Sequence, residues 1–141
     1  GIIVDGLDNV DLRIGKCCHP VPGDPIVGYI TKGSGITIHH AECHNIKTNG
    51  RIVPVEWDDE HSNSFSAKIR ITALDRKNVL GDVIQKLTIL NTNISELNAV
   101  SANDTTIINL SLSVRNVEQL ISIVNTIKRV KDVFSVERII Q

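Results

Sequence analysis

Three cysteines and one histidine form the residue pattern in this sequence that is best suited to chemistry. Cys17 and Cys18 are adjacent, and His39 and Cys43 follow with three residues between them. An i, i+4 pair fits a single helical turn, which would direct the imidazole and the thiol at one point. Three thiolates and one imidazole complete the tetrahedral shell of a zinc ion and leave no open position for water. The pattern therefore predicts a structural zinc site.

The adjacent cysteines can share one ion only if the backbone turns there. In an extended strand, neighbouring side chains point to opposite faces. Pro20 and the Pro22–Gly23 pair just beyond the cysteines favour such a turn. Buried inert thiols and a strained Cys17–Cys18 disulfide remain as alternatives. Spacing alone also leaves open which imidazole binds, because three further histidines flank the cysteines: His19, His40 and His44.

A second candidate site lies where a predicted strand leads into a predicted helix. The first backbone N–H groups of a helix lack partners within it and attract anions, so the carboxylate of a free amino acid fits there. Asparagines beyond the helix could contact an ammonium group, and aliphatic neighbours favour an aliphatic ligand. The candidate ligand residues are Asp75, Asn78, Val79, Leu80, Asn91, Asn93 and Ile94. The competing interpretation is structural, with the asparagines serving only as cap and turn residues.

The composition of the chain changes near residue 63. Residues 1–63 hold five Lys/Arg and nine Asp/Glu, a net charge of −4, whereas residues 64–141 hold ten and seven, a net charge of +3. The polar run 58–64 contains no apolar residue and is typical of a linker. All cysteines, histidines and prolines precede this boundary. We therefore predict two domains, at residues 1–62 and 63–141.

The second domain repeats a pattern of strand and helix. Segments 67–73 and 108–114 alternate like one-sided strands, and segments 94–101 and 133–139 are also extended in character. Two apolar stripes of equal spacing predict helices near Asn78 and Asn116, the latter in a capping box with Gln119. The stripes are Leu80, Val83, Ile84, Leu87 and Leu90, and Val117, Leu120, Ile121, Val124 and Ile127. The order βαββαβ predicts a ferredoxin-like antiparallel sheet with both helices on one face.

The first domain is expected to be small and rich in β-structure. Its short apolar stretches, at 12–14, 26–30, 36–39 and 52–56, are separated by Gly/Pro turns. About 60 residues of short strands form a weak core, and domains of this size often depend on a metal or a disulfide. Zinc would supply that cross-link. The whole chain is thus predicted to be an α+β protein, with a small β-rich metal-binding domain before the ferredoxin-like one.

The overall composition excludes several classes of protein. The 141 residues carry 15 Lys/Arg and 16 Asp/Glu, and a net charge of −1 disfavours a strongly electrostatic nucleic-acid or membrane binder. No window approaches the roughly 20 apolar residues of a spanning helix, so no membrane partner is expected. Only four residues are aromatic, which argues against base stacking. A Gly at position 1 and the absence of Met favour a piece of a longer protein.

Two segments of the sequence resemble a known family. Lys16-Cys17-Cys18-His19-Pro20, with the residues that follow to Gly33, and His39-His40-Ala41-Glu42-Cys43 closely resemble the C-terminal regulatory region of the long Rel/SpoT stringent factors, which make and hydrolyse (p)ppGpp. The resemblance implies a zinc-finger or conserved-cysteine domain, with Cys17, Cys18, His39 and Cys43 as ligands, followed by an ACT domain. The looser ACT motif Asp-Arg-x-x-x-Leu appears as Asp75 to Leu80. His40 stands where the family often has Arg, and Asn78 where many ACT domains have Gly.

The function implied by the resemblance is regulatory. In this family, synthetase and hydrolase domains precede the region, so the present chain is not expected to be an enzyme. The implied partners are the ribosome, through ribosomal RNA, the uncharged tRNA in its A site, and the catalytic domains of the same cytoplasmic protein. ACT domains elsewhere bind amino acids at side-by-side dimer interfaces. A homodimer that binds a branched-chain amino acid is therefore the alternative function.

An enzyme is a third interpretation of the sequence. The βαββαβ fold also occurs in acylphosphatases, and Arg76 with Asn93 could form a phosphate site. No paired carboxylates, activated nucleophile or open metal position in the sequence support this interpretation.

Overall fold

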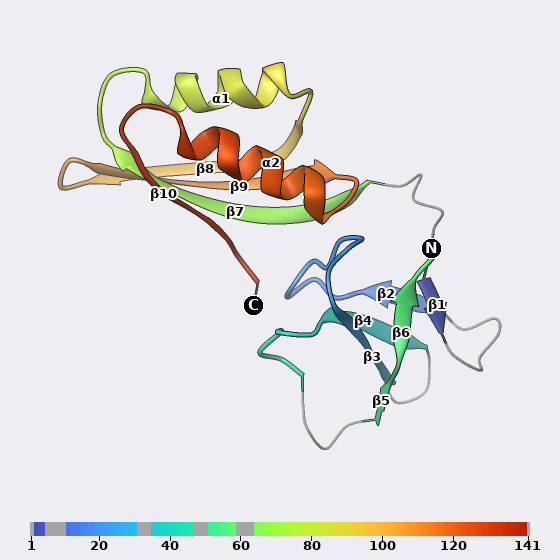
Figure 1. The fold of residues 1–141 in the computed structure, drawn as a ribbon. Helices are drawn as coiled ribbons and strands as arrows, with labels where there is room; N and C mark the ends of the chain where they lie inside the picture. The colour runs from blue at the N-terminus through green and yellow to red at the C-terminus, as the bar shows by residue number, and fades with distance from the viewer. Residues whose placement is uncertain (1, 5–10, 31–34, 47–50, 59–63, 141) are drawn as a thin grey trace.

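The computed structural model describes residues 2–4, 11–30, 35–46, 51–58 and 64–140. These residues form two helices and ten strands, and the strands are arranged in three sheets. Figure 1 shows two parts, a sheet covered on one face by both helices, and a smaller β-rich part beside its open face. The boundary predicted between residues 62 and 63 lies outside the described residues.

The second part has the predicted order of elements. Strand β7 (Phe65–Leu74) leads to helix α1 (Val79–Ile89), and the antiparallel pair β8 (Asn93–Ala102) and β9 (Thr105–Val114) follows. Helix α2 (Val117–Lys128) and strand β10 (Val133–Arg138) complete it. The strand order is β10-β7-β9-β8, with antiparallel neighbours throughout. The predicted ferredoxin-like fold is confirmed.

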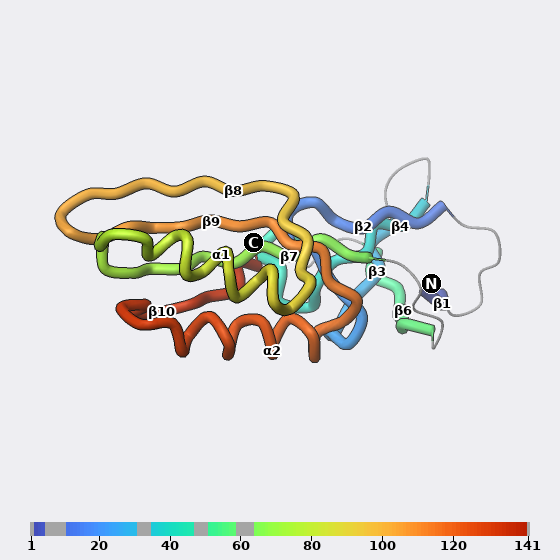
Figure 2. The backbone as a smooth tube through the Cα atoms, turned by 90° about the horizontal axis from the view of Figure 1, so that it is seen from above, coloured from blue at the N-terminus to red at the C-terminus, as the bar shows by residue number. Residues whose placement is uncertain are grey.

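Alternation along the central strands builds the core between the sheet and the helices. In β7 the residues that point to the helices are buried, whereas Lys68 and Arg70 on the open face are exposed. In β9 the same alternation buries four apolar side chains: Ile108, Leu110, Leu112 and Val114. Strand β8 forms the outer edge of the sheet, and Figure 2 shows it running along one side of this layer.

The two helices depart from the predicted apolar stripes at particular positions. In α1 the buried residues are Val79, Val83 and Leu87, so Val79 belongs to the stripe. In α2 the buried residues are Leu120, Ile123 and Ile127. The assignment of Ile121 to this stripe is wrong, since its side chain is 54% exposed. A helix turns by about 100° per residue, which carries Ile121 away from the face of Leu120.

The predicted capping box at α2 is confirmed. The Asn116 side chain accepts a hydrogen bond from the Gln119 N–H at 2.8 Å. The Gln119 side chain accepts one from the Arg115 N–H at 2.7 Å. Asn78, at the start of α1, has a φ of 67° and caps no N–H group with its side chain. This left-handed conformation favours Gly or Asn.

The first part consists of two small sheets. Strand β1 (Ile2–Val4) pairs with β6 (Val55–Trp57). The larger sheet has the order β2-β4-β3-β5, in which β2 (Leu12–Ile14) runs parallel to β4 (Ile36–His40) and β3 (Ile26–Ile30) is antiparallel to its neighbours. The stretch predicted at 52–56 is divided between β5 (Arg51–Val53) and β6 by Pro54, which cannot donate a ladder hydrogen bond.

The two parts of the chain contact each other near the ends of β6 and β7. The rings of Trp57 and Phe65 meet edge to face, with their centroids 5.4 Å apart. Neither helix in the described part of the chain is long and apolar enough to cross a membrane.

Candidate metal centre and ligand sites

A tight turn presents the two adjacent cysteines on one side of the backbone. The His19 N–H donates to the Gly15 carbonyl oxygen at 3.0 Å, which closes a turn around Cys17 and Cys18. The turn predicted at the adjacent cysteines is therefore confirmed. The Gly15 N–H donates to the carbonyl oxygen of Ile38, on strand β4, at 2.8 Å. This hydrogen bond fixes the start of the turn against β4.

His39 and Cys43 approach the same point from a strand and a turn. His39 lies in β4, and the Cys43 N–H donates to the His40 carbonyl oxygen at 2.9 Å in the turn that follows. The single helical turn expected for this pair is wrong. The pairing of β4 with β3, His39 opposite Val27, extends the backbone at His39.

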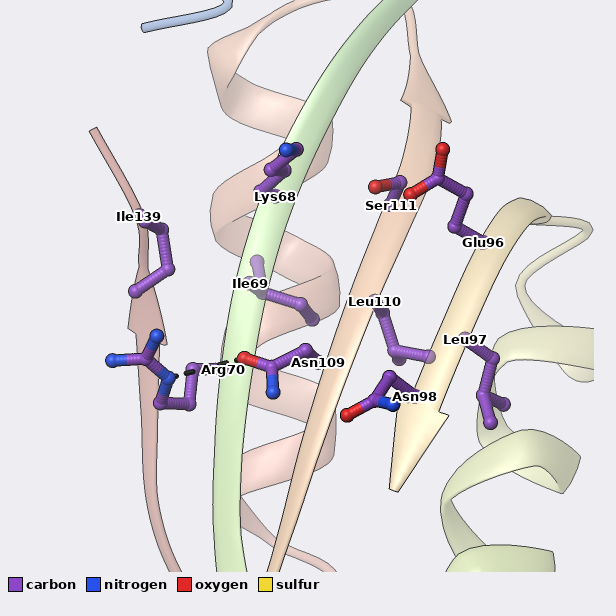
Figure 3. A pocket seen from close by; sticks show the side chains of 10 residues that line it. All are labelled: Lys68, Ile69, Arg70, Glu96, Leu97, Asn98, Asn109, Leu110, Ser111 and Ile139. Carbon is purple, nitrogen blue, oxygen red and sulfur yellow. Dashed lines mark hydrogen bonds between the residues drawn. The ribbon is translucent and has the colours of Figure 1, made fainter. Parts of the chain in front are cut away.

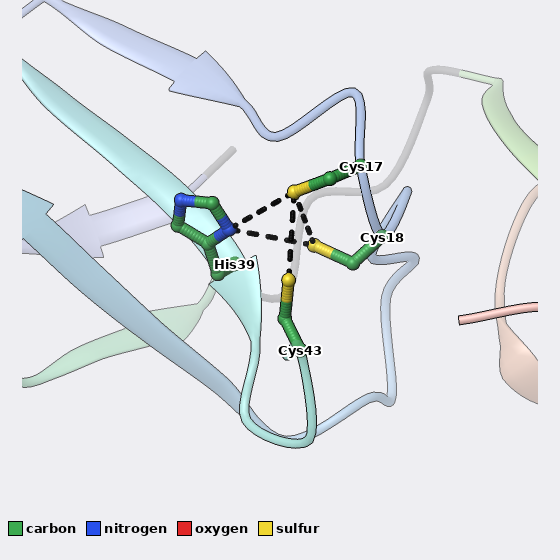
Figure 4. Close-up of side chains that lie close together, drawn as sticks. All are labelled: Cys17, Cys18, His39 and Cys43. Carbon is green, nitrogen blue, oxygen red and sulfur yellow. Dashed lines mark hydrogen bonds between the residues drawn. The ribbon is translucent and has the colours of Figure 1, made fainter. Parts of the chain in front are cut away.

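The four side chains converge on one point (Figure 4). The Cys17 Sγ lies 3.4 Å from the His39 Nδ1 and 3.4 Å from the Cys43 Sγ, and the Cys18 Sγ lies 3.6 Å from the His39 Nδ1. The ligand atoms all lie within 4.8 Å of one another. In a tetrahedron with Zn–S bonds of 2.3 Å, two sulfurs are about 3.8 Å apart. The cluster could therefore hold a metal ion, and its donor set and spacing suit zinc.

The geometry distinguishes among the alternatives left by the spacing. The Cys17 and Cys18 sulfurs are 3.9 Å apart, whereas a disulfide bond between them would need about 2.05 Å. His39 is the histidine in the cluster. His40 instead accepts a hydrogen bond at its Nδ1 from the Glu42 N–H at 3.0 Å.

Burial and hydrogen bonding give the cluster thiols different acidities. Burial raises the pKa of the Cys18 thiol to about 12, against the opposing effect of the His40 N–H, and burial also raises the pKa of Cys43. Burial acts in the same direction on Cys17, but hydrogen bonds with Asn45, Cys43 and Cys18 outweigh it and lower its pKa. Cys17 is thus the first of the three to supply a thiolate. Burial lowers the pKa of His39 and favours the neutral imidazole that a metal needs.

Metal binding is therefore expected to release protons and to strengthen as the pH rises. At pH 7 the metal-free chain holds protons on Cys18 and Cys43, because the pKa of each is raised, while the ligand is the thiolate. Release of at least these two protons makes the apparent affinity rise at least about 100-fold per pH unit, and acid weakens binding by the same factor. Calorimetric titration with zinc in two buffers of different ionisation enthalpy counts these protons. Release of almost no protons on zinc binding would contradict the assignment of Cys18 and Cys43 as protonated thiols in the metal-free chain.

The residues of the second candidate site divide between the two ends of α1. The chain from Asp75 to Leu80 borders a hollow of about 570 Å³ between the start of this helix and strands β8 and β9. Asn91, with a φ of 51°, forms the turn after the helix, and Asn93 and Ile94 begin β8. An 11-residue helix is about 16 Å long, so one chain does not bring the two groups together.

The Arg76 guanidinium binds side chains and a backbone carbonyl of its own domain. Its Nε donates to Asp132 at 2.7 Å and one of its terminal nitrogens lies 2.9 Å from Asp82. The same group donates to the Lys131 carbonyl oxygen at 2.9 Å. Arg76 therefore joins the start of α1 to the loop before β10. It lies at the opposite end of α1 from Asn93, and the phosphate site considered for an enzyme is not assembled.

Two charged residues that the sequence did not single out meet beside the metal cluster. Asp24 is buried, and both of its carboxylate oxygens lie 2.7 Å from the guanidinium of Arg138 on β10. The residue pattern of β10 could have indicated that Arg138 has a buried partner. Arg138 follows buried Val136 by two residues, so a charge occupies the core-facing side of β10, and an inward charge requires a partner.

Together, these features define a class of protein, a ferredoxin-like domain preceded by a β-rich unit with a closed Cys₃His cluster. Family models agree with both parts. Residues 2–58 match the RelA/SpoT RIS domain, and residues 61–138 match the ACT domain.

Individual relatives cover almost the whole chain. It is 35% identical over 142 residues to a GTP pyrophosphokinase of Myxococcus xanthus, covering 99% of this chain and 19% of the relative. It is 37% identical over 147 residues to a GTP pyrophosphokinase of Haemophilus influenzae, covering 98% of this chain and 20% of the relative. The crystal structure of the ACT domain from a Chlorobium tepidum GTP pyrophosphokinase superposes with a TM-score of 0.50 at 26% identity, covering 54% of this chain and 99% of that domain.

This chain belongs to the Rel/SpoT family and corresponds to the C-terminal regulatory region of its long members. It spans about a fifth of the length of these relatives. The resemblance seen in the sequence is confirmed.

Proposed function

We propose that this chain is a non-catalytic regulatory module of a long Rel/SpoT protein, built around a structural zinc ion. The observation that carries the proposal is the closed Cys₃His cluster, whose four protein donors leave no position for a substrate or a water. Cys17, Cys18, His39 and Cys43 would hold the ion, which acts as a cross-link between the Cys17–Cys18 turn and the end of β4. The synthesis or hydrolysis of (p)ppGpp belongs to other domains of the parent protein, which this module would control.

The proposed partner of the module is the ribosome with an uncharged tRNA in its A site. Contacts to RNA would use phosphates and shape, because aromatic side chains are scarce and two of the four, Trp57 and Phe65, pack against each other. The open face of the sheet offers Lys68 and Arg70 beside the amides of Asn98 and Asn109 (Figure 3). The Arg70 Nε donates to Asn109 at 3.0 Å, which fixes the guanidinium on this face.

Binding of the module to ribosomes is expected to weaken steeply with salt. With three to four phosphate contacts, raising the salt from 50 to 200 mM should reduce the affinity about 40- to 150-fold. The double variant Lys68→Gln, Arg70→Gln should lower the slope of log affinity against log salt by about two. Co-sedimentation with ribosomes over a salt series measures both. Lys86→Gln, on exposed α1, is the matched control, and binding indifferent to salt would exclude this mode of docking.

A second candidate function is amino-acid sensing, and the hollow at the start of α1 favours it. The lining combines Asp75, Asn78 and Ser101 with aliphatic Val79 and Leu80. Among the described residues no strand pairs with the outer edge of β8, so this edge could pair with a second copy, which would supply Asn91, Asn93 and Ile94 from the partner. Calorimetry with valine and isoleucine tests this proposal. Absence of heat at millimolar concentration, with no change in mass, would remove it.

A further inference from the structure

The loop that follows the cluster cysteines is fitted to the ACT domain. The Val117 N–H, at the first turn of α2, donates to the Pro22 carbonyl oxygen at 2.8 Å. Gly23 has a φ of 101°, and a Cβ there would overlap the Val117 side chain. Val21 is completely buried and belongs to the same apolar cluster as Leu120 and Val136. The loop from residue 19 to residue 24 is thus part of the packing of α2 and β10.

Asp24 is the polar centre of this contact. Its side chain is 2% exposed, and each terminal nitrogen of Arg138 donates to one of its carboxylate oxygens at 2.7 Å. The Val21 N–H donates to the Asp24 Oδ2 at 2.8 Å, and the Trp57 indole N–H donates to the Asp24 carbonyl oxygen at 3.0 Å. The Arg138 guanidinium also donates to the His19 carbonyl oxygen at 3.2 Å. A buried carboxylate held by this many donors tolerates little displacement.

His40 connects this centre to the cluster. Its backbone N–H donates to the Cys18 Sγ at 3.3 Å. Its Nδ1 accepts from the Glu42 N–H, which leaves the ring proton on Nε2, 3.7 Å from the Asp24 Oδ1. Buried His40 therefore contacts a cluster thiol through its backbone and the Asp24 carboxylate through its ring.

We propose that Asp24 couples the metal cluster to the ACT domain, so that occupancy of the cluster sets how tightly the 19–24 loop holds α2 and β10. The proposal rests on the metal site proposed above. A bound ion cross-links the turn that continues into this loop to the strand end that carries His40. Both supports of Asp24 are then fixed relative to each other. Without the ion, the turn and the strand end can separate and the contact at Val117 and Arg138 loosens.

Hydrogen exchange on the whole 141-residue chain tests the coupling. The informative amide is that of Val117, because its acceptor is Pro22 in the other part of the chain. Removal of zinc by a chelator should speed its exchange at least about tenfold, together with amides of β10, as typical coupling free energies allow. The exchange rate of the Asn109 backbone amide, in the centre of the sheet, should not change. If zinc binds and its removal leaves Val117 unchanged, the coupling is refuted while the metal site stands. If the chain binds no metal, the metal site and the coupling are both refuted.

Coupling must also act in the reverse direction. Asp24→Asn should weaken zinc binding by about the factor by which zinc protects Val117, since coupling between two sites is reciprocal. Arg138→Lys, which loses the paired contact but keeps the charge, should act in the same sense and serves where Asp24→Asn is poorly folded. Arg129→Gln, exposed at the C-terminal end of α2, is the matched control. Competition with a fluorescent chelator measures the affinities, and unchanged affinities in folded Asp24→Asn and Arg138→Lys would overturn the proposal.

Discussion

Replacement of Cys43 by serine will remove the metal and unfold most of the N-terminal part of the chain. Apart from prolines, five apolar side chains are buried in the described part of residues 1–58: Cys18, Val21, Ile36, Ile38 and Cys43. Two of these are cluster ligands, and Val21 packs in the ACT core, so only Ile36 and Ile38 remain as a core independent of the cluster. Structural zinc contributes about 10–16 kcal/mol to the folding of small domains, far more than so few side chains supply.

Metal analysis and circular dichroism of purified Cys43→Ser measure this effect. We expect less than about a tenth of the wild-type zinc content, since a serine hydroxyl is a poor zinc ligand. The ACT strands should remain folded, because their core is formed mainly by their own residues. A matched histidine pair supplies the control: His39→Asn should lose the metal, and His44→Asn, next to Cys43 but outside the cluster, should keep it. A Cys43→Ser protein with one zinc per chain and native β-structure would refute this account.

The second large effect is expected from Arg138→Leu. This change leaves the Asp24 carboxylate buried without its cation, and such a truncation typically costs about 3–5 kcal/mol. Denaturant unfolding of the metal-loaded chain measures the loss. Adding Asp24→Asn to Arg138→Leu should recover part of the stability, because no unpaired charge is then buried.

Arg70→Gln is the control for the loss of an arginine as such. Arg70 is exposed and bonds to Asn109 on the open face, so its replacement should change the unfolding free energy by less than about 0.5 kcal/mol. An Arg138→Leu chain destabilised no more than the Arg70→Gln chain would show that the Asp24–Arg138 pair does not hold the two parts together.

The ACT part of the fold is predictable because local patterns and the global fold agree there. The alternation from Ile108 to Val114 defines a one-sided strand, and Asn116 with Gln119 marks a helix start, before any long-range contact is considered. The error at Ile121 arises because a template spacing places it on the stripe, whereas the start of α2 at Val117 turns it outward. The sequence shows the period of a helix more clearly than its phase.

The N-terminal part is less predictable because its contacts are non-local. The strands are short, and the parallel pairing of β2 with β4 joins residues more than 20 positions apart with no turn signal to specify it. The three cluster cysteines are found from their type and spacing, but spacing leaves open which histidine joins them, and the family resemblance is what implies His39. The backbone that presents His39 and Cys43 is not found from spacing, since a strand followed by a turn brings them as close as a helical turn would.

The contact between the two parts could not be derived from spacing. Asp24 and Arg138 are separated by 114 positions, and neither belongs to a motif that names the other. The inward-facing charge on β10 signals only that some partner exists. Which partner it has depends on the packing of the 19–24 loop against α2, which no local pattern encodes.

X-ray absorption at the zinc edge of the purified chain tests the central claim most directly. The account predicts one zinc per chain with three sulfur neighbours at about 2.3 Å and one nitrogen at about 2.0–2.1 Å. Cys43→Ser is predicted to lose at least about nine tenths of the zinc signal. Wild-type protein without stoichiometric metal, or with a shell of oxygen and nitrogen only, would contradict the account.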